Sequence, residues 1–247
     1  FPNPALEAAA DPVGDLDAFL TESLLADLNA VERRLDRAKK EKLDPLEVGA
    51  FELMKATLEA EQPLRSLPPL ALDRSKLSGY GFLTDRPLMV VLNRSEQEAA
   101  QPLPAAIAGR LAPLHAAGLV LSASVEAEIA AMAPADQKAF LDDLGLTESA
   151  LTRFIRTAYG LLDLISFFTV GPDEVRAWPI LRGTKARPAA GKIHSDLERG
   201  FIRAEVIPYD RFIEVGSEAA ARETGHLKIE GKDYVVADGD ILHIRFN

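Results

Sequence analysis

The sequence predicts a mixed architecture, in which an α/β region that carries a helical hairpin is followed by an α+β module. Apolar residues repeat every three or four positions through residues 16–58, as they do in paired helices. Residues 87–122 read as strand, helix and strand, which is a βαβ unit. After residue 164, short strand candidates alternate with turn signals, which is typical of a separate small module.

The composition is that of a globular protein with an acidic balance. The 247 residues are 47% hydrophobic and 27% charged, which suits one large or two small cores, and the net charge is −10. This charge excludes a globally basic surface for DNA, and the absence of cysteine excludes disulfides, thiolate metal sites and cysteine nucleophiles. The chain shows neither an apolar run near the ~20 residues of a membrane span nor a signal-peptide pattern, so we expect a cytoplasmic protein.

Two amphipathic helices with a short connection come first. One spans residues 16–40, and the next begins where Asp44 can cap, Pro45 suits the first helical position and Glu47 completes a capping box. Helices joined this closely predict an antiparallel hairpin. Packing explains most of the apolar stripe, and an interaction arm is the functional alternative. The stripe consists of Leu20, Leu24, Leu28, Val31, Leu35 and Ala38, followed by Phe51, Met54 and Leu58.

A buried strand that ends on polar residues is the first candidate binding feature. The run "RPLMVVLN" stops at Asn93, Glu96 follows three positions later, and "LVLSAS" is a second short strand with a polar end. We expect the helix between the two strands to end at Gly118. Ligands of open α/β sheets bind just beyond the carboxyl ends of the strands, so these residues are candidates to hold one. The Asn-x-x-Glu spacing alone arises often by chance, and its place at a strand end is the better evidence.

Two further helices and five short strands complete the predicted elements. Helices are expected at "SVEAEIAAM" and at "LTESALTRFIRTAYGLLDLI", whose apolar residues, Phe154 and Ile155 among them, share one face. Strands are expected at "FFTVG", "EVRAWPI", "FIRAEVI", "KDYVV" and "ILHIRFN", with the turn signals "GT", "EGK" and "ADGD" between them. A module of roughly 80 residues has an ordinary domain size.

Several kinds of chemistry are excluded by spacing. His194, Ser195 and Asp196 are the residue types of a hydrolase triad, but adjacent residues cannot converge as a triad requires. The four histidines are scattered, so we predict no metal cluster. The chain as given contains no G-x-x-x-x-G-K-[ST] loop, and it therefore lacks a phosphate cradle and a hydroxyl for Mg²⁺. We predict no catalytic residues in it.

Basic residues gather in one segment of an otherwise acidic chain. Residues 176–203 carry seven Lys or Arg against Asp196 and Glu198, which predicts a local anion-binding surface. The alternative is a solvated face whose charges pair with the acids of residues 205–240. The basic residues are Arg176, Arg182, Lys185, Arg187, Lys192, Arg199 and Arg203.

The C-terminal segments "VRAWPI", "AAGKIHSD", "GFIRAEVI", "GKDY" and "DGD", in this order, resemble the TGS domain of the YchF/Obg-like ATPases. Upstream, "DPVGDLDAFLTESLLADLNAVERRL" is similar to the start of that family's helical arm, and "LNRSE" and "SASVEAEI" are similar to its base-recognition motif and the segment after it. The resemblance covers essentially the whole chain and is weakest over residues 41–86. These proteins are translation-factor-class P-loop NTPases.

The resemblance implies a nucleotide site that prefers ATP, with Mg²⁺ as its metal in the full-length family. Asn93 would contact the base, the backbone at Arg94 would lie against it, Glu96 would shape the pocket, and Ser122, Ala123 and Ser124 would line its far side. The family's P-loop and switch regions precede the position that matches Phe1, so this chain would hold half of a nucleotide site and bind no cofactor tightly alone. We also predict that the basic segment contacts ribosomal RNA or another polyanion, because its charge is concentrated within an acidic chain.

The implied architecture has four parts. Residues 1–15 are a residual segment of the NTPase domain, 16–80 form the helical hairpin or coiled-coil arm, 81–163 are the C-terminal part of the NTPase domain, and 164–247 form a β-grasp TGS domain. The implied function is that of an ATP-binding, ribosome-associated ATPase. The alternative is a non-hydrolysing RNA- or ribosome-binding module built on the TGS domain and the arm, and a P-loop in the full-length gene would favour the first.

Overall fold

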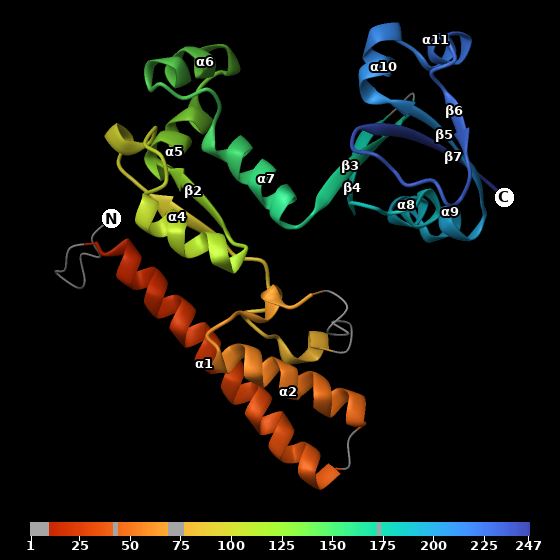
Figure 1. Ribbon diagram of the computed structural model, residues 1–247. Helices are drawn as coiled ribbons and strands as arrows, with labels where there is room; N and C mark the ends of the chain where they lie inside the picture. Colours follow the sequence, from red (N-terminus) through yellow and green to blue (C-terminus); the bar gives the residue numbers. More distant parts are fainter. Residues whose placement is uncertain (1–9, 42–43, 69–76, 172–173) are drawn as a thin grey trace. The chain divides into compact units, whose positions relative to one another are not determined.

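The computed structural model describes residues 10–41, 44–68, 77–171 and 174–247 (Figure 1). The chain divides between Leu161 and Leu162 into two compact units, and each is described here by itself. Within the described ranges, every helix is too short or too polar to cross a lipid bilayer.

The first unit begins with two packed helices, α1 (Pro12–Glu41) and α2 (Pro45–Glu59). The predicted start of α2 is confirmed, because the Asp44 carboxylate accepts the Leu46 N–H at 3.0 Å and Pro45 occupies the first turn. Glu47 accepts two hydrogen bonds from Arg34 of α1, at 3.1 and 2.6 Å, and so ties the helices together. Their shared core contains Val31, Phe51, Met54, Leu58, Leu64, Leu77 and Phe82.

A buried carboxylate joins α1 to the segment that leads into the sheet. Asp27, which is 3% exposed, accepts hydrogen bonds from the Leu83 N–H at 2.9 Å and from the N–H and hydroxyl of Thr84, both at 2.7 Å. The Thr84 hydroxyl oxygen in turn accepts the Leu64 N–H at 3.2 Å. A buried polar group is stable only when it is hydrogen-bonded, so these contacts fix where the following strand begins.

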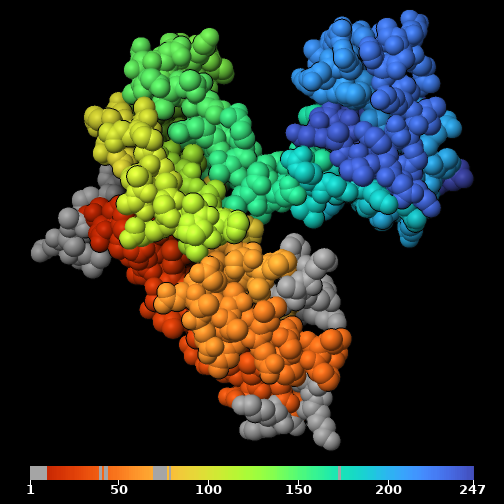
Figure 2. Space-filling model, in the orientation of Figure 1, coloured from red at the N-terminus to blue at the C-terminus, as the bar shows by residue number. Residues whose placement is uncertain are grey.

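The predicted βαβ unit is confirmed. Strands β1 (Met89–Asn93) and β2 (Ala117–Leu121) pair in parallel, and α4 (Ala105–Leu111) connects them. The apolar side of α4 covers one face of this small sheet (Figure 1), and the yellow-green atoms of this part of the chain lie together in Figure 2. Parallel strands need such a crossover, because a tight turn cannot return the chain in the same direction.

The prediction that the crossover helix ends at Gly118 is wrong. The helix ends at Leu111, a short 3₁₀ turn (Ala112–Leu114) containing Pro113 follows, and Gly118 lies inside β2. A Cβ atom at this position would collide with the side chains of Leu103 and Leu111. Gly118 therefore lets the crossover pack closely on the strand, which is a common reason for glycine within a strand.

Three helices complete the first unit: α5 (Ala123–Ala131), α6 (Pro134–Asp143) and α7 (Ala150–Leu161). Val125, Ile129 and Leu146 form their core. The Glu126 carboxylate of α5 accepts the N–H groups of Ala150 and Leu151 at 2.7 and 3.2 Å, and it thereby caps α7. The predicted apolar face of α7 is exposed at Leu151, Phe154 and Ile155.

The second unit is a five-stranded sheet in the order β4-β3-β7-β5-β6. Its central pair, β3 and β7, is parallel, and the other pairs are antiparallel. Helices α8 and α9 lie on one side of the sheet and α10 and α11 on the other (Figure 1). The strands are β3 (Leu164–Val170), β4 (Val175–Leu181), β5 (Phe201–Pro208), β6 (Lys228–Glu230) and β7 (Asp240–Phe246). The helices are α8 (Ala186–Ile193), α9 (Ser195–Arg199), α10 (Tyr209–Val215) and α11 (Glu218–Glu223).

Four of the five predicted strands of this unit are confirmed, and the strand predicted at "KDYVV" is wrong. That segment makes only an isolated bridge between Val235 and Lys185, and the additional strand is β6, just before it. Here Tyr234 donates its hydroxyl to Asp240 at 2.7 Å, and Asp240 also accepts the Ala237 N–H at 2.8 Å. Burial and this carboxylate raise the pKa of Tyr234. The side-chain hydrogen bonds to Asp240 therefore hold residues 232–237 in place, where the sequence predicts the backbone hydrogen bonds of a strand.

We predict that Asp27→Ala lowers the free energy of unfolding by about 1–3 kcal/mol, because it leaves buried N–H groups of residues 83 and 84 without an acceptor. Urea denaturation followed by circular dichroism measures the change. Glu22→Ala, an exposed carboxylate on the same helix, is the matched control and should change stability by no more than about 0.5 kcal/mol. Equal midpoints for both variants would show that Asp27 does not anchor α1.

Candidate functional site

The carboxyl ends of β1 and β2 lie side by side and bring the predicted polar residues together. Asn93 is the last residue of β1 and pairs with Leu121, the last residue of β2. The Asn93 side-chain oxygen accepts the Ala123 N–H at 3.0 Å. The Arg94 N–H donates to the Leu121 carbonyl at 2.8 Å. Parallel pairing thus places residues that are far apart in sequence at one edge, as expected for a ligand site in an α/β sheet.

The start of α5 forms the second wall of this site. Ser122 precedes the helix and is buried, and its hydroxyl lies 3.0 Å from that of Ser124. Ala123 is the first residue of the helix, and N–H groups in a first helical turn have no partner within the helix. Asn93 supplies the partner for Ala123, so the amide side chain is fixed in direction.

Arg94 holds the loop after β1 through contacts that the sequence did not single out. Its guanidinium donates to Glu98 at 3.0 Å and to Gln101 at 2.7 Å, and the Ser95 hydroxyl lies 3.2 Å from the other Glu98 oxygen. The signal that could have identified Glu98 is its position four residues after Arg94, the spacing at which side chains meet on a helical turn. Glu96, by contrast, is exposed at the start of the 3₁₀ turn Glu96–Glu98.

The site contains hydrogen-bond donors and acceptors side by side. The Asn93 amide keeps its two N–H donors, and its oxygen retains a second lone pair beyond the one used by Ala123. The hydroxyls of Ser122 and Ser124 can donate or accept. An amide pairs well with the adenine edge that offers a donor beside an acceptor. Within the described ranges, no three His, Asp or Glu side chains come together as a metal site would require.

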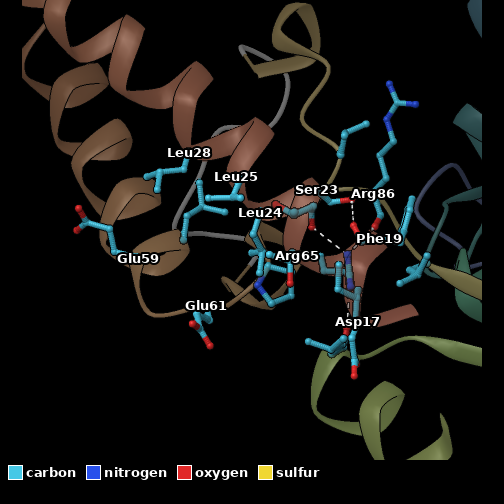
Figure 3. Close-up of a pocket in the computed structure, with 18 of the residues that line it drawn as sticks. Asp17, Phe19, Ser23, Leu24, Leu25, Leu28, Glu59, Glu61, Arg65 and Arg86 are labelled. Carbon is cyan, nitrogen blue, oxygen red and sulfur yellow. Dashed lines mark hydrogen bonds between the residues drawn. The ribbon is translucent and has the colours of Figure 1, made fainter. Parts of the chain in front are cut away.

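A separate cavity of about 730 Å³ lies in the first unit, and it is mostly apolar. In Figure 3, Leu24, Leu25 and Leu28 project from α1 along its wall, and Arg65 lies near its centre. Arg65 donates to the carbonyls of Leu114, Thr84 and residue 86, and burial lowers the pKa of its guanidinium. These contacts satisfy the cation within the protein, so the cavity differs in character from the polar strand-end site.

Most of the predicted basic residues of the second unit have a partner within it. Arg176 lies 4.3 Å from the Trp178 ring and 3.9 Å from Glu174, and an ion pair this exposed contributes little to stability. The ion pairs are Arg182 with Asp163 at 3.0 Å, Lys185 with Asp233 at 2.7 Å, and Arg199 with Asp196. Arg187 donates to the Glu198 carbonyl at 3.1 Å, whereas Lys192 is exposed on α8.

Arg203 does not share a face of the sheet with the basic residues of α8. Ala204 and Val206 belong to the core under α8, so their neighbours Arg203 and Glu205 point to the opposite face, because side chains alternate along a strand. The seven basic residues therefore occupy both sides of the second unit.

The comparisons with known proteins agree with this arrangement over nearly the whole chain. A family model described as "Protein of unknown function (DUF933)", YchF-GTPase_C, matches residues 164–247. "Ribosome-binding ATPase YchF" of Bacillus subtilis (strain 168) is 40% identical over 246 residues, which cover 96% of this chain and 67% of that protein. "Obg-like ATPase 1" of Gallus gallus is 32% identical, with 98% and 64% covered.

A solved structure matches as well. The Schizosaccharomyces pombe YchF GTPase superposes with a TM-score of 0.82 at 28% identity, over 97% of this chain and 67% of that one. Fold and site define a mixed α/β protein with a polar site at the ends of parallel strands. Given the extent of the sequence match, the chain belongs to the YchF/Obg-like ATPase family.

We predict that Asn93→Ala speeds hydrogen exchange of the Ala123 amide, because this N–H then loses its acceptor. Amide exchange followed by NMR measures the rate. Glu96→Ala is the matched control, since Glu96 is exposed in the same loop, and it should leave the Ala123 rate unchanged. An unchanged rate in Asn93→Ala would mean that the amide does not bridge β1 and α5.

Proposed function

We propose that this chain carries the base-recognition part and the partner-binding parts of an ATP-binding, ribosome-associated ATPase. The observation that supports this most directly is the contact between Asn93 and the Ala123 N–H at the carboxyl ends of β1 and β2. Relatives named "Ribosome-binding ATPase YchF" support both the proposed binding of ATP and the proposed association with the ribosome. The six residues proposed to contact the nucleotide are Asn93, Arg94, Glu96, Ser122, Ala123 and Ser124.

Adenine is the base that suits this site. Guanine offers two adjacent donors that a carboxylate can accept together, whereas the N6/N7 edge of adenine offers one donor and one acceptor. The Asn93 N–H donors are available for N7, and the remaining lone pair of the amide oxygen can accept from the 6-amino group. Glu96 then shapes the outer rim of the pocket, which agrees with its exposed position.

We assign the domains by the same reasoning. Residues 16–80 are the helical arm, 81–163 the C-terminal part of the NTPase domain, and 164–247 a β-grasp TGS domain. The strand order of the second unit supports the last assignment, because a parallel central pair with antiparallel flanks is the arrangement expected of a β-grasp sheet. Of the residual segment 1–15, residues 1–9 lie outside the described residues.

Phosphate chemistry needs groups that this sequence does not contain. Phosphoryl transfer depends on a lysine and backbone N–H groups around the phosphates and on a hydroxyl that holds Mg²⁺. No G-x-x-x-x-G-K-[ST] loop occurs in the 247 residues. We therefore predict no Mg²⁺-dependent ATP turnover by this chain alone, measured as released phosphate. Turnover that stays with the chain through a final column would contradict this.

Base selectivity can be tested on the chain itself. In a titration followed by NMR, adenosine should shift the amide signals of Arg94 and Ala123 more than guanosine does. Asn93→Ala should remove the adenosine response, and Glu98→Ala, which loosens the loop but keeps the amide, is the comparison variant. Equal responses to both nucleosides, or an adenosine response that survives Asn93→Ala, would remove Asn93 from base recognition.

In a longer protein that includes a P-loop, Asn93→Ala should weaken ATP binding by about 1–3 kcal/mol, which is roughly 5- to 150-fold in the dissociation constant. Isothermal titration calorimetry measures this. The same titration with Glu96→Asp asks whether Glu96 sets the preference between ATP and GTP. An unchanged ratio of the dissociation constants for ATP and GTP would show that Glu96 does not set this preference alone.

Ribosome association is the second part of the proposal. The basic residues 176–203 are proposed to contact ribosomal RNA, although Arg182 and Lys185 also pair with acids. Co-sedimentation with purified ribosomes over a range of salt concentrations tests it, because phosphate contacts weaken as salt rises. A chain that remains in the supernatant at low salt would overturn this part.

A further inference from the structure

Two arginines lie directly opposite each other on neighbouring strands of the second unit. In the antiparallel pair of β5 and β7, Arg203 is the register partner of Arg245. Their Cα atoms are thus about 4.5–5.5 Å apart, with both side chains on the face opposite α8. Like charges in this position destabilise a sheet. The arrangement costs stability to the extent that negative groups nearby do not compensate it.

A single buried carboxylate anchors the cluster without neutralising it. Glu205 is 5% exposed, and it accepts two hydrogen bonds from Arg245 and one from Arg222 of α11, at 3.2, 3.2 and 3.1 Å. The hydrogen bond from Arg245 is the main cause that lowers the pKa of Glu205, and the charges of Arg245 and Arg222 lower it further. Two guanidinium groups therefore share one carboxylate, which leaves a net positive charge, and Arg203 adds a further one opposite Arg245. His243 lies opposite Glu205 on the same face.

Arg203 differs from the other arginines of this unit. It is exposed, and within the described residues it makes no ion pair or side-chain hydrogen bond, whereas Arg182, Arg199 and Arg211 each pair with an acid. Arg222 and Arg245 each retain N–H donors beyond those that Glu205 accepts. Glu205 thus holds the side chains of Arg222 and Arg245 in place, and Arg203, opposite Arg245, adds further N–H donors on the same face.

We propose that Arg203, Arg222 and Arg245 bind a phosphate group of an RNA backbone on this face of the sheet. Arginine binds phosphate oxygens through two parallel N–H groups, and a phosphate between the two strands would remove the repulsion. Ile229, the register partner of Glu205 on β6, is exposed beside the cluster and offers an apolar surface to a sugar or base. Cations gathered on one small part of a sheet face suit a single phosphate better than an extended acidic peptide.

The proposal deepens the proposed ribosome association and rests on it for the identity of the RNA. It assigns binding roles to Arg222 and Arg245, which lie outside the basic segment of residues 176–203. The site is on the sheet face opposite α8, so it is distinct from Arg187 and Lys192 on that helix.

Fluorescence anisotropy of the whole chain with a labelled 12-nucleotide single-stranded RNA tests the proposal, over a series of KCl concentrations. Arg203→Gln should weaken binding and lower the slope of log K against log salt by about 0.7, the value for one phosphate contact. The control is Arg211→Gln, which removes the same charge from an arginine that already pairs with Glu214 at 2.8 Å, and it should keep the slope. Arg203→Lys should restore the slope and part of the affinity.

Thermal unfolding without RNA separates binding from folding. Arg203→Gln should keep or raise the midpoint, because the repulsion with Arg245 disappears. Equal slopes for Arg203→Gln and Arg211→Gln would overturn the proposal, as would a loss of binding accompanied by a lower midpoint. A poly-glutamate peptide that binds as tightly as the RNA and depends equally on Arg203 would also overturn it in favour of an acidic protein partner.

The two proposals fail differently. If the wild-type chain does not co-sediment with ribosomes, the ribosome association is wrong, whatever the variants do with the short RNA. If it co-sediments and binds the RNA but Arg203→Gln behaves like wild type, only the phosphate site is wrong.

Discussion

The parallel pairing of β1 with β2 is the constraint on which the candidate site depends. It aligns Asn93 with Leu121 and so places the amide beside the first turn of α5, where the Ala123 N–H needs an acceptor. Parallel strands also require a crossover. The crossover packs so closely on β2 that no side chain larger than that of glycine fits at position 118. Glycine in the strand and asparagine at its neighbour's end are thus two consequences of one pairing.

Sequence reasoning succeeded where a local pattern and the tertiary structure agree. The cap of Asp44 and Pro45, the two parallel strands of the βαβ unit and most strands of the second unit follow from periodicity and turn chemistry, which act over a few residues. The burial predicted for both strands holds only for part of β2, because β1 has no buried residue. It failed at Gly118 and at "KDYVV" for one reason. Contacts from Leu103 and from Asp240 override the local preference, and no pattern within either segment contains them.

The candidate site shows the same limit in its details. The placement of Asn93 at a strand end could be predicted, since the apolar run stops there. The direction of its amide could not, because it depends on the Ala123 N–H thirty residues later. Likewise, the role of Glu98 in holding Arg94 is visible only once the loop forms a 3₁₀ turn. Glu96 has the more conspicuous spacing, and its contribution to the site stays a prediction.

Charge counted along a sequence differs from charge presented on a surface. The segment 176–203 is the most basic stretch, yet pairing with Asp163, Asp196 and Asp233 uses much of that charge. The alternation of β5 then sends Arg203 to the opposite face, where it meets Arg245 from the far end of the chain. Cross-strand register therefore creates a cluster that neither segment shows alone. Glu205 carries a single negative charge against the guanidinium groups of Arg222 and Arg245, so a net positive charge stays on the face opposite α8, away from most of the basic segment.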